Sequence, residues 1–302
     1  MIVVTGATGN VGRPLVEALA AAGEQVTAVS RHGGAAGVPG VAGASGATGM
    51  SGVPGQVGLP GRVVHQRADL ESPDSLKGVL DGADALFLLL AGEMLVDDAK
   101  AGRLLDAVKA SGVGRIVLLS SQGARTRPQA PSHSGLRRVE EAVQRSGLSW
   151  TILRAGGFAS NAFGWAQMVR EQRMVAAPFG DVALPVVDPA DIAAVAAAAL
   201  TGAKHGGHVY ELTGPEAVSP RQQASAIGDA IGVPVRFHEL SRGAAREQFL
   251  RFMPEAVADG TLDILGRPSD DEQRVSSDVE LVLGRAPGGF GDWVRRNVAA
   301  FS

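Results

Sequence analysis

The sequence predicts an α/β fold, with a doubly wound parallel sheet and a smaller substrate-side subdomain towards the C-terminus. Three observations predict it. An apolar run, a glycine-rich loop and an amphipathic stretch follow one another at the start of the chain. Short apolar runs then alternate with helical patterns as far as about residue 155. Finally, 45% of the 302 residues are hydrophobic, which is enough to build a globular core.

The first unit reads as strand, loop, helix and strand. Ile2 to Val4 form a short apolar run that is typical of a buried strand. Val11, Leu15 and Leu19 then recur at helical spacing, so one face of the next stretch is apolar. Gln25 to Ser30 form a second strand pattern. The order is that of a βαβ unit.

The alternation continues beyond this unit. Four more strands are predicted, at residues 62–66, 85–90, 115–120 and 150–153. Helical patterns separate them at residues 97–110 and 136–145. Strands that alternate with helices in this way form a parallel sheet with helices on both faces.

The second half of the chain has a mixed pattern. It predicts a helix at residues 191–200, a strand at 208–212, a helix at 220–230 and a helical tail. We therefore expect residues 1–155 to form a cofactor-binding core. We expect residues 156–302 to complete the sheet and to form the substrate-side subdomain that closes a cleft over it.

A glycine-rich segment interrupts the core. Glycine occupies every third position from Gly34 to Gly61, which is the pattern of a collagen-like chain. The segment lies between the second and third predicted strands, where the chain must return to the same sheet. A straight polyproline II rod of this length would hold its ends roughly 80 Å apart. We therefore predict an insertion in a surface loop rather than a triple helix.

Composition excludes several classes of function. The net charge of −3 and the scattered Lys and Arg residues provide no basic field for nucleic acid. The chain has no cysteine, so it has neither a thiolate metal site nor a cysteine nucleophile, and we expect no metal site. The longest apolar stretch, Ile192 to Leu200, is too short to span a membrane. We expect a cytoplasmic protein.

The motif TGATGNVG, from Thr5 to Gly12, follows the first strand and opens the first helix. Gly6 would permit the tight turn, Gly9 would leave room for a pyrophosphate, and Gly12 would let the helix pack close to the strand. This context is that of a dinucleotide site in a Rossmann-like fold. The predicted cofactor-binding loop also includes Ala7, Thr8, Asn10 and Val11.

The end of the second strand indicates which nicotinamide cofactor binds. An acidic residue there would accept hydrogen bonds from the ribose 2′-hydroxyl, whereas this chain has Ser30 and Arg31, which suit a 2′-phosphate. NADP(H) is therefore the predicted cofactor. The alternative is that Arg31 is an ordinary solvated arginine displaced by the neighbouring insertion.

These features resemble the NmrA-like branch of the atypical short-chain dehydrogenase/reductases. The resemblance covers most of the chain and rests on the glycine-rich loop, Arg31 and four further segments, RADL at 67–70, SSQGA at 120–124, SGLSWTILR at 146–154 and VDPADIA at 187–193. It implies that Asp69 and Leu70 lie near the adenine. It also implies that the rest of the cofactor cleft is lined by Leu90, Ala91, Gly92, Ser120, Ala155, Gly156 and Phe158.

The chain departs from the wider family at the catalytic pair. That family uses Tyr-x-x-x-Lys before the sixth strand, with the tyrosine as proton donor. Here the spacing falls on Ser132 and Leu136, and the only tyrosine, Tyr210, belongs to a late strand. His133 is the nearest candidate acid, although it can equally be a helix-capping or exposed residue. Ser121 and Gln122 can orient a substrate carbonyl or simply close the loop after the strand.

Two functions fit these observations. The first is an NADPH-dependent reductase of a quinone or aromatic ketone, since such a substrate could dispense with a strong proton donor. The aromatic and apolar residues Phe158, Phe163, Trp165, Met168 and Phe179 would then line a cleft for a flat aromatic substrate, or else pack in a core. The second is a non-enzymatic NADP(H)-sensing regulator that binds a protein partner, which the resemblance also permits.

Overall fold

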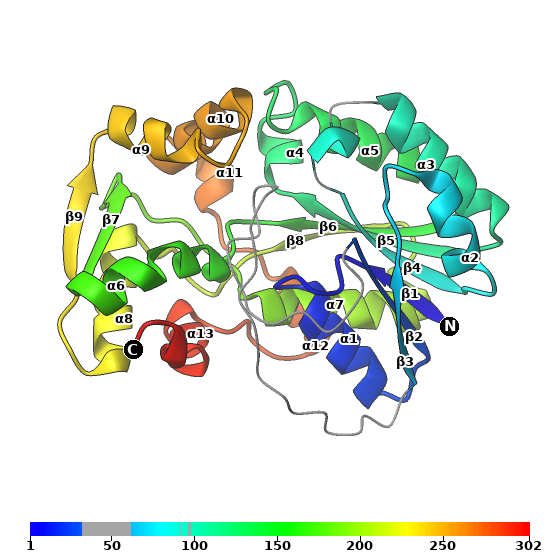
Figure 1. The fold of residues 1–302 in the computed structure, drawn as a ribbon, viewed down its shortest axis with the longest axis horizontal. Helices are drawn as coiled ribbons and strands as arrows, with labels where there is room; N and C mark the ends of the chain where they lie inside the picture. The colour runs from blue at the N-terminus through cyan, green and yellow to red at the C-terminus, as the bar shows by residue number, and fades with distance from the viewer. Residues whose placement is uncertain (32–61, 91, 96–97) are drawn as a thin grey trace.

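The computed structural model describes residues 1–31, 62–90, 92–95 and 98–302. Over these residues the chain has the predicted α/β fold, in which a seven-stranded parallel sheet carries helices on both faces and adjoins a smaller lobe (Figure 1). The predicted insertion at residues 34–61 lies outside the described residues.

The central sheet has the strand order β3-β2-β1-β4-β5-β6-β8, and every neighbouring pair is parallel. The order reverses between β1 and β4, and ligands of open α/β sheets bind at the carboxyl ends of strands beside such a switch point. The strands are β1 (Ile2–Thr5), β2 (Val26–Ser30), β3 (Val63–Arg67), β4 (Ala85–Leu89), β5 (Arg115–Ser121), β6 (Ser149–Ala155) and β8 (His208–Leu212).

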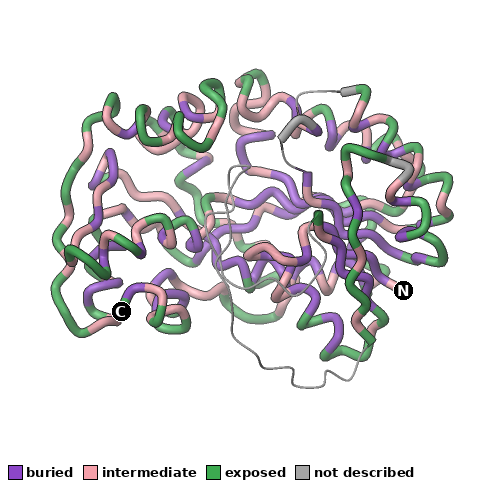
Figure 2. The backbone as a smooth tube through the Cα atoms, viewed as in Figure 1, coloured by how far each residue is buried: buried purple, intermediate pink, exposed green. Residues whose placement is uncertain are grey.

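Two layers of helices cover the sheet because its buried strands are apolar on both faces. In β1, Ile2 and Val4 face a core with α1, α7 and α12, whereas Val3 faces a second core with α2, α3 and α5. Figure 2 shows the inner strands buried between the two layers, whereas the edge strand β3 is largely exposed. The bounds are α1 (Gly12–Ala21), α2 (Lys77–Leu80), α3 (Asp98–Ala110), α4 (Gly123–Thr126), α5 (Ser134–Gln144), α7 (Pro189–Thr201) and α12 (Asp278–Leu283), with 3-10 turns η1 (Pro73–Leu76), η2 (Gly92–Leu95) and η4 (Ala203–His205).

The smaller lobe has its own apolar core and a two-stranded parallel sheet, β7–β9. Neither strand is predicted from the sequence, because MVAAP and RFHEL are short and neither alternates cleanly between apolar and polar residues. The lobe contains η3 (Ala159–Trp165), α6 (Ala166–Gln172), β7 (Met174–Pro178), α8 (Pro220–Ile231), β9 (Arg236–Leu240), α9 (Arg242–Phe249), α10 (Glu255–Gly266), α11 (Asp270–Gln273), α13 (Phe290–Arg296) and η5 (Val298–Ala300).

The C-terminal tail is tied to the start of α7 by two ion pairs. Asp188 caps α7 by accepting a hydrogen bond from the backbone N–H of Ala190 at 2.9 Å, and it also pairs with Arg296. Asp191 pairs with Arg285, at 2.7 Å between Oδ1 and a guanidinium nitrogen. Both carboxylates are buried, so each pair fixes the tail against the central sheet's helical layer.

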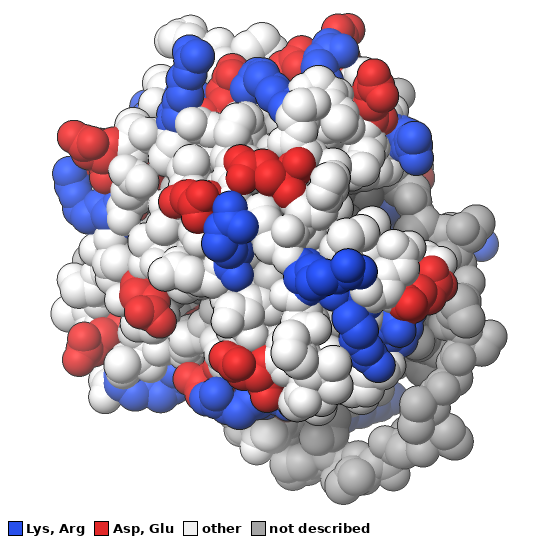
Figure 3. Space-filling view, turned by 90° about the vertical axis from the view of Figure 1, so that its left-hand side faces the viewer, with Lys and Arg blue, Asp and Glu red and all other residues white. Residues whose placement is uncertain are grey.

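Charges of both signs are mixed on the lobe's outer face. Figure 3 shows Lys and Arg side chains interspersed with Asp and Glu, with no extended patch of one sign in that view. On this lobe Arg221 pairs with Asp181 at 2.9 Å, for example, and its guanidinium lies 4.7 Å from the centre of the Phe237 ring.

Candidate functional site

The glycine-rich loop lies between β1 and α1, at the carboxyl edge of the sheet. Gly6 has a φ of +64°, a backbone conformation that residues with a side chain rarely adopt. Its carbonyl accepts a hydrogen bond from the backbone N–H of Gly9 at 2.9 Å. A Cβ added to Gly12 would lie 2.1 Å from the Gly6 oxygen. The turn is therefore closed so tightly that Gly12 admits no side chain, as the sequence predicts.

This loop leaves hydrogen-bond donors free at the start of a ten-residue helix, α1. Within the described residues, the backbone N–H groups of Asn10 and Val11 have no acceptor. Free N–H groups at a helix N-terminus, together with the helix dipole, suit a phosphate. The residues present therefore fit the pyrophosphate of a dinucleotide.

A hydrogen-bonded threonine stands next to this loop at the end of β1. The hydroxyl of Thr5 donates to the carbonyl of Phe87 at 3.0 Å and accepts the N–H of Leu89 at 2.9 Å. These bonds join the ends of β1 and β4 across the switch point. Of the residues predicted along β4, Leu90 is buried, Gly92 begins η2, and Ala91 lies outside the described residues.

The predicted adenine end of the site is exposed. Arg31 follows β2 and is exposed, while the neighbouring Ser30 accepts the N–H of Ala68 on its carbonyl at 3.3 Å. Asp69 is also exposed, and its Oδ1 accepts the N–H of Glu71 at 3.1 Å. Leu70 is half-buried. The structure thus brings Arg31 and the carboxyl ends of β2 and β3 to one edge of the sheet.

Ser120 contributes to a buried charge network. Its hydroxyl donates to Glu140 at 2.6 Å, and the same carboxylate accepts bonds from Arg154, the shortest at 2.7 Å. Glu140 is only 1% exposed, and a buried charge needs a partner, which Arg154 provides. The network fastens α5 to β5 and β6.

Ser121 ends β5 and Gln122 follows it, and both side chains already make hydrogen bonds. The hydroxyl of Ser121 accepts the N–H of Gly123 at 3.1 Å. The side-chain amide of Gln122 donates to the carbonyl of Asp271 at 3.0 Å, and its backbone N–H donates to the carbonyl of Ala155 at 2.9 Å. Gln122 therefore links the ends of β5 and β6 to α11.

His133 packs against the turn after β5. Its Nδ1 lies 2.9 Å from the Ser132 hydroxyl, and a Cβ added to Gly123 would lie 2.3 Å from the imidazole ring. Burial lowers the pKa of His133, an effect that the charge of Glu272 opposes and that of Arg127 reinforces. The sequence shows no carboxylate near His133, whereas the fold brings Glu272 close enough to influence it.

Five charged residues that the sequence did not indicate meet near His133. Arg125 pairs with Glu211 and, at 2.7 Å, with Asp271. Arg127 donates to both oxygens of Glu272, at 2.7 and 2.8 Å. The Arg-x-Arg and Asp-Asp-Glu segments that carry most of these charges are far apart in sequence, so no local spacing indicates that they meet. Together they bridge the sheet and the smaller lobe.

The segment after β6 enters the smaller lobe beside α7. Ala155 is buried, and Gly156 donates its N–H to the carbonyl of Leu212 at 2.9 Å. Phe158 forms an isolated parallel bridge with Val187 and packs on the core beneath the sheet. These three predicted cofactor residues therefore stand at the carboxyl ends of β6 and β8.

Several residues of the predicted aromatic cleft pack in the smaller lobe, although Phe163 also lines a cavity there. The Phe163 ring lies 4.8 Å from Trp293 and 6.1 Å from Phe301, between ring centres. The ring of Phe179 lies against Gly266 of α10, where an added Cβ would be 2.6 Å away. Tyr210 is buried in β8 with its hydroxyl 2.9 Å from His205, so it is no proton donor at the crevice.

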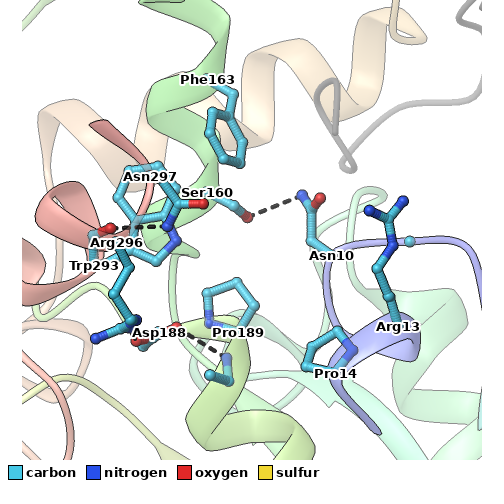
Figure 4. Close-up of a pocket in the computed structure, with 12 residues that line it drawn as sticks. Asn10, Arg13, Pro14, Ser160, Phe163, Asp188, Pro189, Trp293, Arg296 and Asn297 are labelled. Atoms are coloured by element: carbon cyan, nitrogen blue, oxygen red, sulfur yellow. Dashed lines mark hydrogen bonds and ion pairs between the residues drawn. The ribbon is translucent and has the colours of Figure 1, made fainter. Parts of the chain in front are cut away.

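A cavity of about 240 Å³ adjoins the glycine-rich loop (Figure 4). It lies where the starts of α1 and α7 meet η3 and α13 of the smaller lobe. Aromatic, amide and charged side chains line it, namely Asn10, Arg13, Ser160, Phe163, Asp188, Trp293, Arg296 and Asn297.

The described ranges contain no helix that is long and apolar enough to cross a membrane. No group of three or more His, Cys, Asp or Glu side chains in those ranges is placed to hold a metal ion.

The chain belongs to the NAD(P)H-binding family, whose sequence profile matches residues 6–203. The predicted resemblance to the NmrA-like branch is supported at the level of the fold. The crystal structure of Nmra, a negative transcriptional regulator, superposes with a TM-score of 0.70 at 20% identity and covers 99% of this chain and 95% of its own. At that identity the likeness concerns the fold alone.

Three relatives are named as reductases or oxidoreductases. A (4-alkanoyl-5-oxo-2,5-dihydrofuran-3-yl)methyl phosphate reductase of Streptomyces griseus is 36% identical over 100% of this chain and 99% of its own length. An NAD(P)H azoreductase of Xenophilus azovorans is 34% identical over 77% of this chain and 82% of its own. Quinone oxidoreductase 2 of Escherichia coli is 28% identical, with 80% and 78% covered.

Proposed function

We propose that this protein is an NADPH-dependent reductase that delivers hydride to a quinone or an aromatic ketone without a Tyr/Lys pair. The observation that carries the proposal is the tight glycine-rich loop, which leaves the N–H groups of Asn10 and Val11 free at the start of α1. The three relatives named as reductases or oxidoreductases support the reaction type.

The chain's own residues would hold the cofactor in four parts. The backbone of residues 6–12 would bind the pyrophosphate, and Ser30 and Arg31 would bind the 2′-phosphate. Asp69 and Leu70 would flank the adenine. The nicotinamide end would be lined by Leu90, Ala91, Gly92, Ser120, Ala155, Gly156 and Phe158. When bound, NADPH supplies the hydride.

The relatives' names favour a conjugated acceptor. They describe an azo compound, a quinone, and a furanone whose ring double bond lies next to carbonyl groups. After hydride addition to such a molecule the negative charge is delocalised, so proton transfer is less demanding. A positioned acid is worth about 10²- to 10⁴-fold where it is needed, and a quinone or hydroxylated aromatic ketone would need it least.

Water or the substrate's own hydroxyl would supply the proton in this proposal. Ser121 and Gln122 would orient the acceptor through the loop after β5. His133 is a poor acid at neutral pH because burial lowers its pKa, and its ring is packed on Gly123. The variant His133→Ala should therefore retain nearly all its turnover. A loss on the order of 100-fold with unchanged cofactor affinity would make His133 the proton donor.

Cofactor choice and acceptor choice can be tested separately. Calorimetry should show tighter binding of NADPH than of NADH, and Arg31→Ala should remove that preference. Arg236→Ala, which changes an exposed arginine of β9, is the matched control and should keep it. Equal affinity of the parent for both cofactors would rule out the role of Arg31. Absorbance at the NADPH band should then fall with quinones or aromatic ketones as acceptors.

A second candidate is an NADP(H)-sensing regulator that binds a protein partner. The missing Tyr/Lys pair and the engagement of Gln122 with the smaller lobe favour it. Under either candidate, residues 1–155 would hold the cofactor and residues 156–302 would provide the substrate or partner side. Tight NADPH binding without oxidation by any conjugated acceptor would favour the sensor.

A further inference from the structure

Asn10 reaches from the glycine-rich loop to the smaller lobe. Its side-chain amide donates a hydrogen bond to the hydroxyl of Ser160 at 3.0 Å, although the two residues are 150 positions apart in sequence. Figure 4 shows the two side chains pointing towards each other at the edge of the cavity. The bond therefore links the predicted phosphate-binding loop directly to η3.

Ser160 is held firmly in place. It is 1% exposed, and Ala159 and Ala162 beside it in η3 are also buried. The following Phe163 packs on Trp293 and Phe301, which come from the C-terminal end of the chain. The position of the Ser160 hydroxyl is thus set by the core of the smaller lobe.

The glycine-rich loop is held by hydrogen bonds on either side of Asn10 and by the buried side chain of Val11. Gly9 donates to the Gly6 carbonyl, and Arg13 donates to the Gly9 carbonyl at 3.1 Å. Between these bonds the N–H groups of Asn10 and Val11 have no acceptor within the described residues. A loop with several glycines has more conformational freedom than a loop with few. Ordering it around a phosphate would therefore cost more entropy, unless a side chain already anchors it.

We infer that Ser160 is a positioning residue for the cofactor, acting through Asn10. Its hydroxyl fixes the Asn10 side chain and so keeps the free backbone N–H groups of the loop directed at the pyrophosphate. The smaller lobe thereby slows cofactor release indirectly, because Ser160 acts through Asn10 and not on the phosphate itself. The inference rests on the proposed NADP(H) site.

The test is the rate of NADPH release, followed by stopped-flow fluorescence after displacement with excess NADP⁺. Ser160→Ala should release NADPH roughly 3- to 10-fold faster than the parent, as expected for loss of one hydrogen bond. Asn10→Ala should have an effect of similar size. Because both variants break the same bond, the double variant should be no faster than the faster single variant.

A matched control lines the same cavity. The side-chain amide of Asn297 donates to the Trp293 carbonyl at 2.8 Å, so Asn297→Ala should leave the release rate unchanged. The thermal unfolding midpoint of each variant, compared with that of the parent, shows whether a faster release comes from a destabilised fold. If Ser160→Ala does not fold, Asn10→Ala tests the same bond, because Asn10 is only half-buried. Release at the parent rate, or effects that simply multiply in the double variant, would overturn the inference. A parent that binds no NADPH would overturn the proposed function along with it.

Discussion

Replacing Arg127 with methionine should destabilise the protein strongly, although Arg127 lies near the surface. Its guanidinium donates to both oxygens of Glu272, whose side chain is only 3% exposed. It also donates to the carbonyl of Arg267 at 2.8 Å, at the end of α10. Methionine keeps much of the apolar stem but removes every one of these bonds.

The size of the effect follows from the carboxylate that is left behind. Without Arg127, Glu272 would retain the Thr126 hydroxyl at 2.8 Å and the backbone N–H of Ser269, but no balancing charge among these contacts. Stranding a buried charge typically costs about 3–5 kcal/mol. Burial raises the pKa of Glu272, but the bonds from Arg127, Ser269 and Thr126 outweigh this effect, so the pKa lies below its usual value. The variant should therefore have a higher Glu272 pKa.

Urea unfolding followed by circular dichroism measures the loss, and the thermal midpoint should fall by about 5 °C or more. Arg137→Met is the matched control, because Arg137 pairs with Glu141 on the surface of α5 at 2.9 Å. An exposed pair of this kind is worth at most about 1 kcal/mol. Adding Glu272→Gln to Arg127→Met should restore part of the stability. If Arg127→Met proved as mild as Arg137→Met, Glu272 would not be a buried charge that depends on Arg127.

Two further predictions concern the loop and the pH response. Gly12→Ala should abolish NADPH binding, because the added methyl would lie 2.1 Å from the Gly6 oxygen, whereas Gly102→Ala, with open space around it, should bind normally; calorimetry decides. His133 has a lowered pKa when folded, so the unfolded chain takes up its proton first and stability falls as the pH drops below about 6.5. In urea titrations, His133→Asn should lose less stability than the parent between pH 7 and pH 5.5. The control is His238→Asn, at an exposed position. If both variants changed the pH dependence equally, His133 would not be the source of the lost stability.

The parts of the fold that local patterns specify could be predicted from the sequence. The inner strands of the central sheet are buried and read as apolar runs, and every strand of that sheet was predicted to within a few residues. The glycine-rich loop was equally legible, because the turn at Gly6 and the contact of Gly12 depend on neighbours within seven positions. By contrast, β7 and β9 form a small two-stranded sheet whose residues are mostly half-buried or exposed. Their pattern was too weak to predict.

The smaller lobe's contribution to the site could not be predicted for a different physical reason. Asn10 with Ser160, and Arg127 with Glu272, are pairs separated by about 150 residues. Their side chains are ordinary for loop and helix-end positions, so only the path of the chain brings them together. The same reasoning explains why Phe163 could be interpreted either as a cleft residue or as core. Its packing partner Trp293 lies 130 positions later.

The backbone is closely packed around Ser132, where the family's tyrosine would stand. The family's tyrosine spacing falls on Ser132, and in the structure a Cβ added to Gly260 of α10 would lie 2.2 Å from the Ser132 hydroxyl. A tyrosine ring on this backbone would have to displace α10 or turn away from it. At the start of α5, a Cβ on Gly135 would lie 1.5 Å from the carbonyl of Leu95, so α5 cannot retreat without moving η2. The absence of the tyrosine is therefore coupled to the close approach of α10, which Arg127 and Glu272 secure. The substitution Ser132→Tyr alone would strain that contact rather than rebuild the family's proton donor.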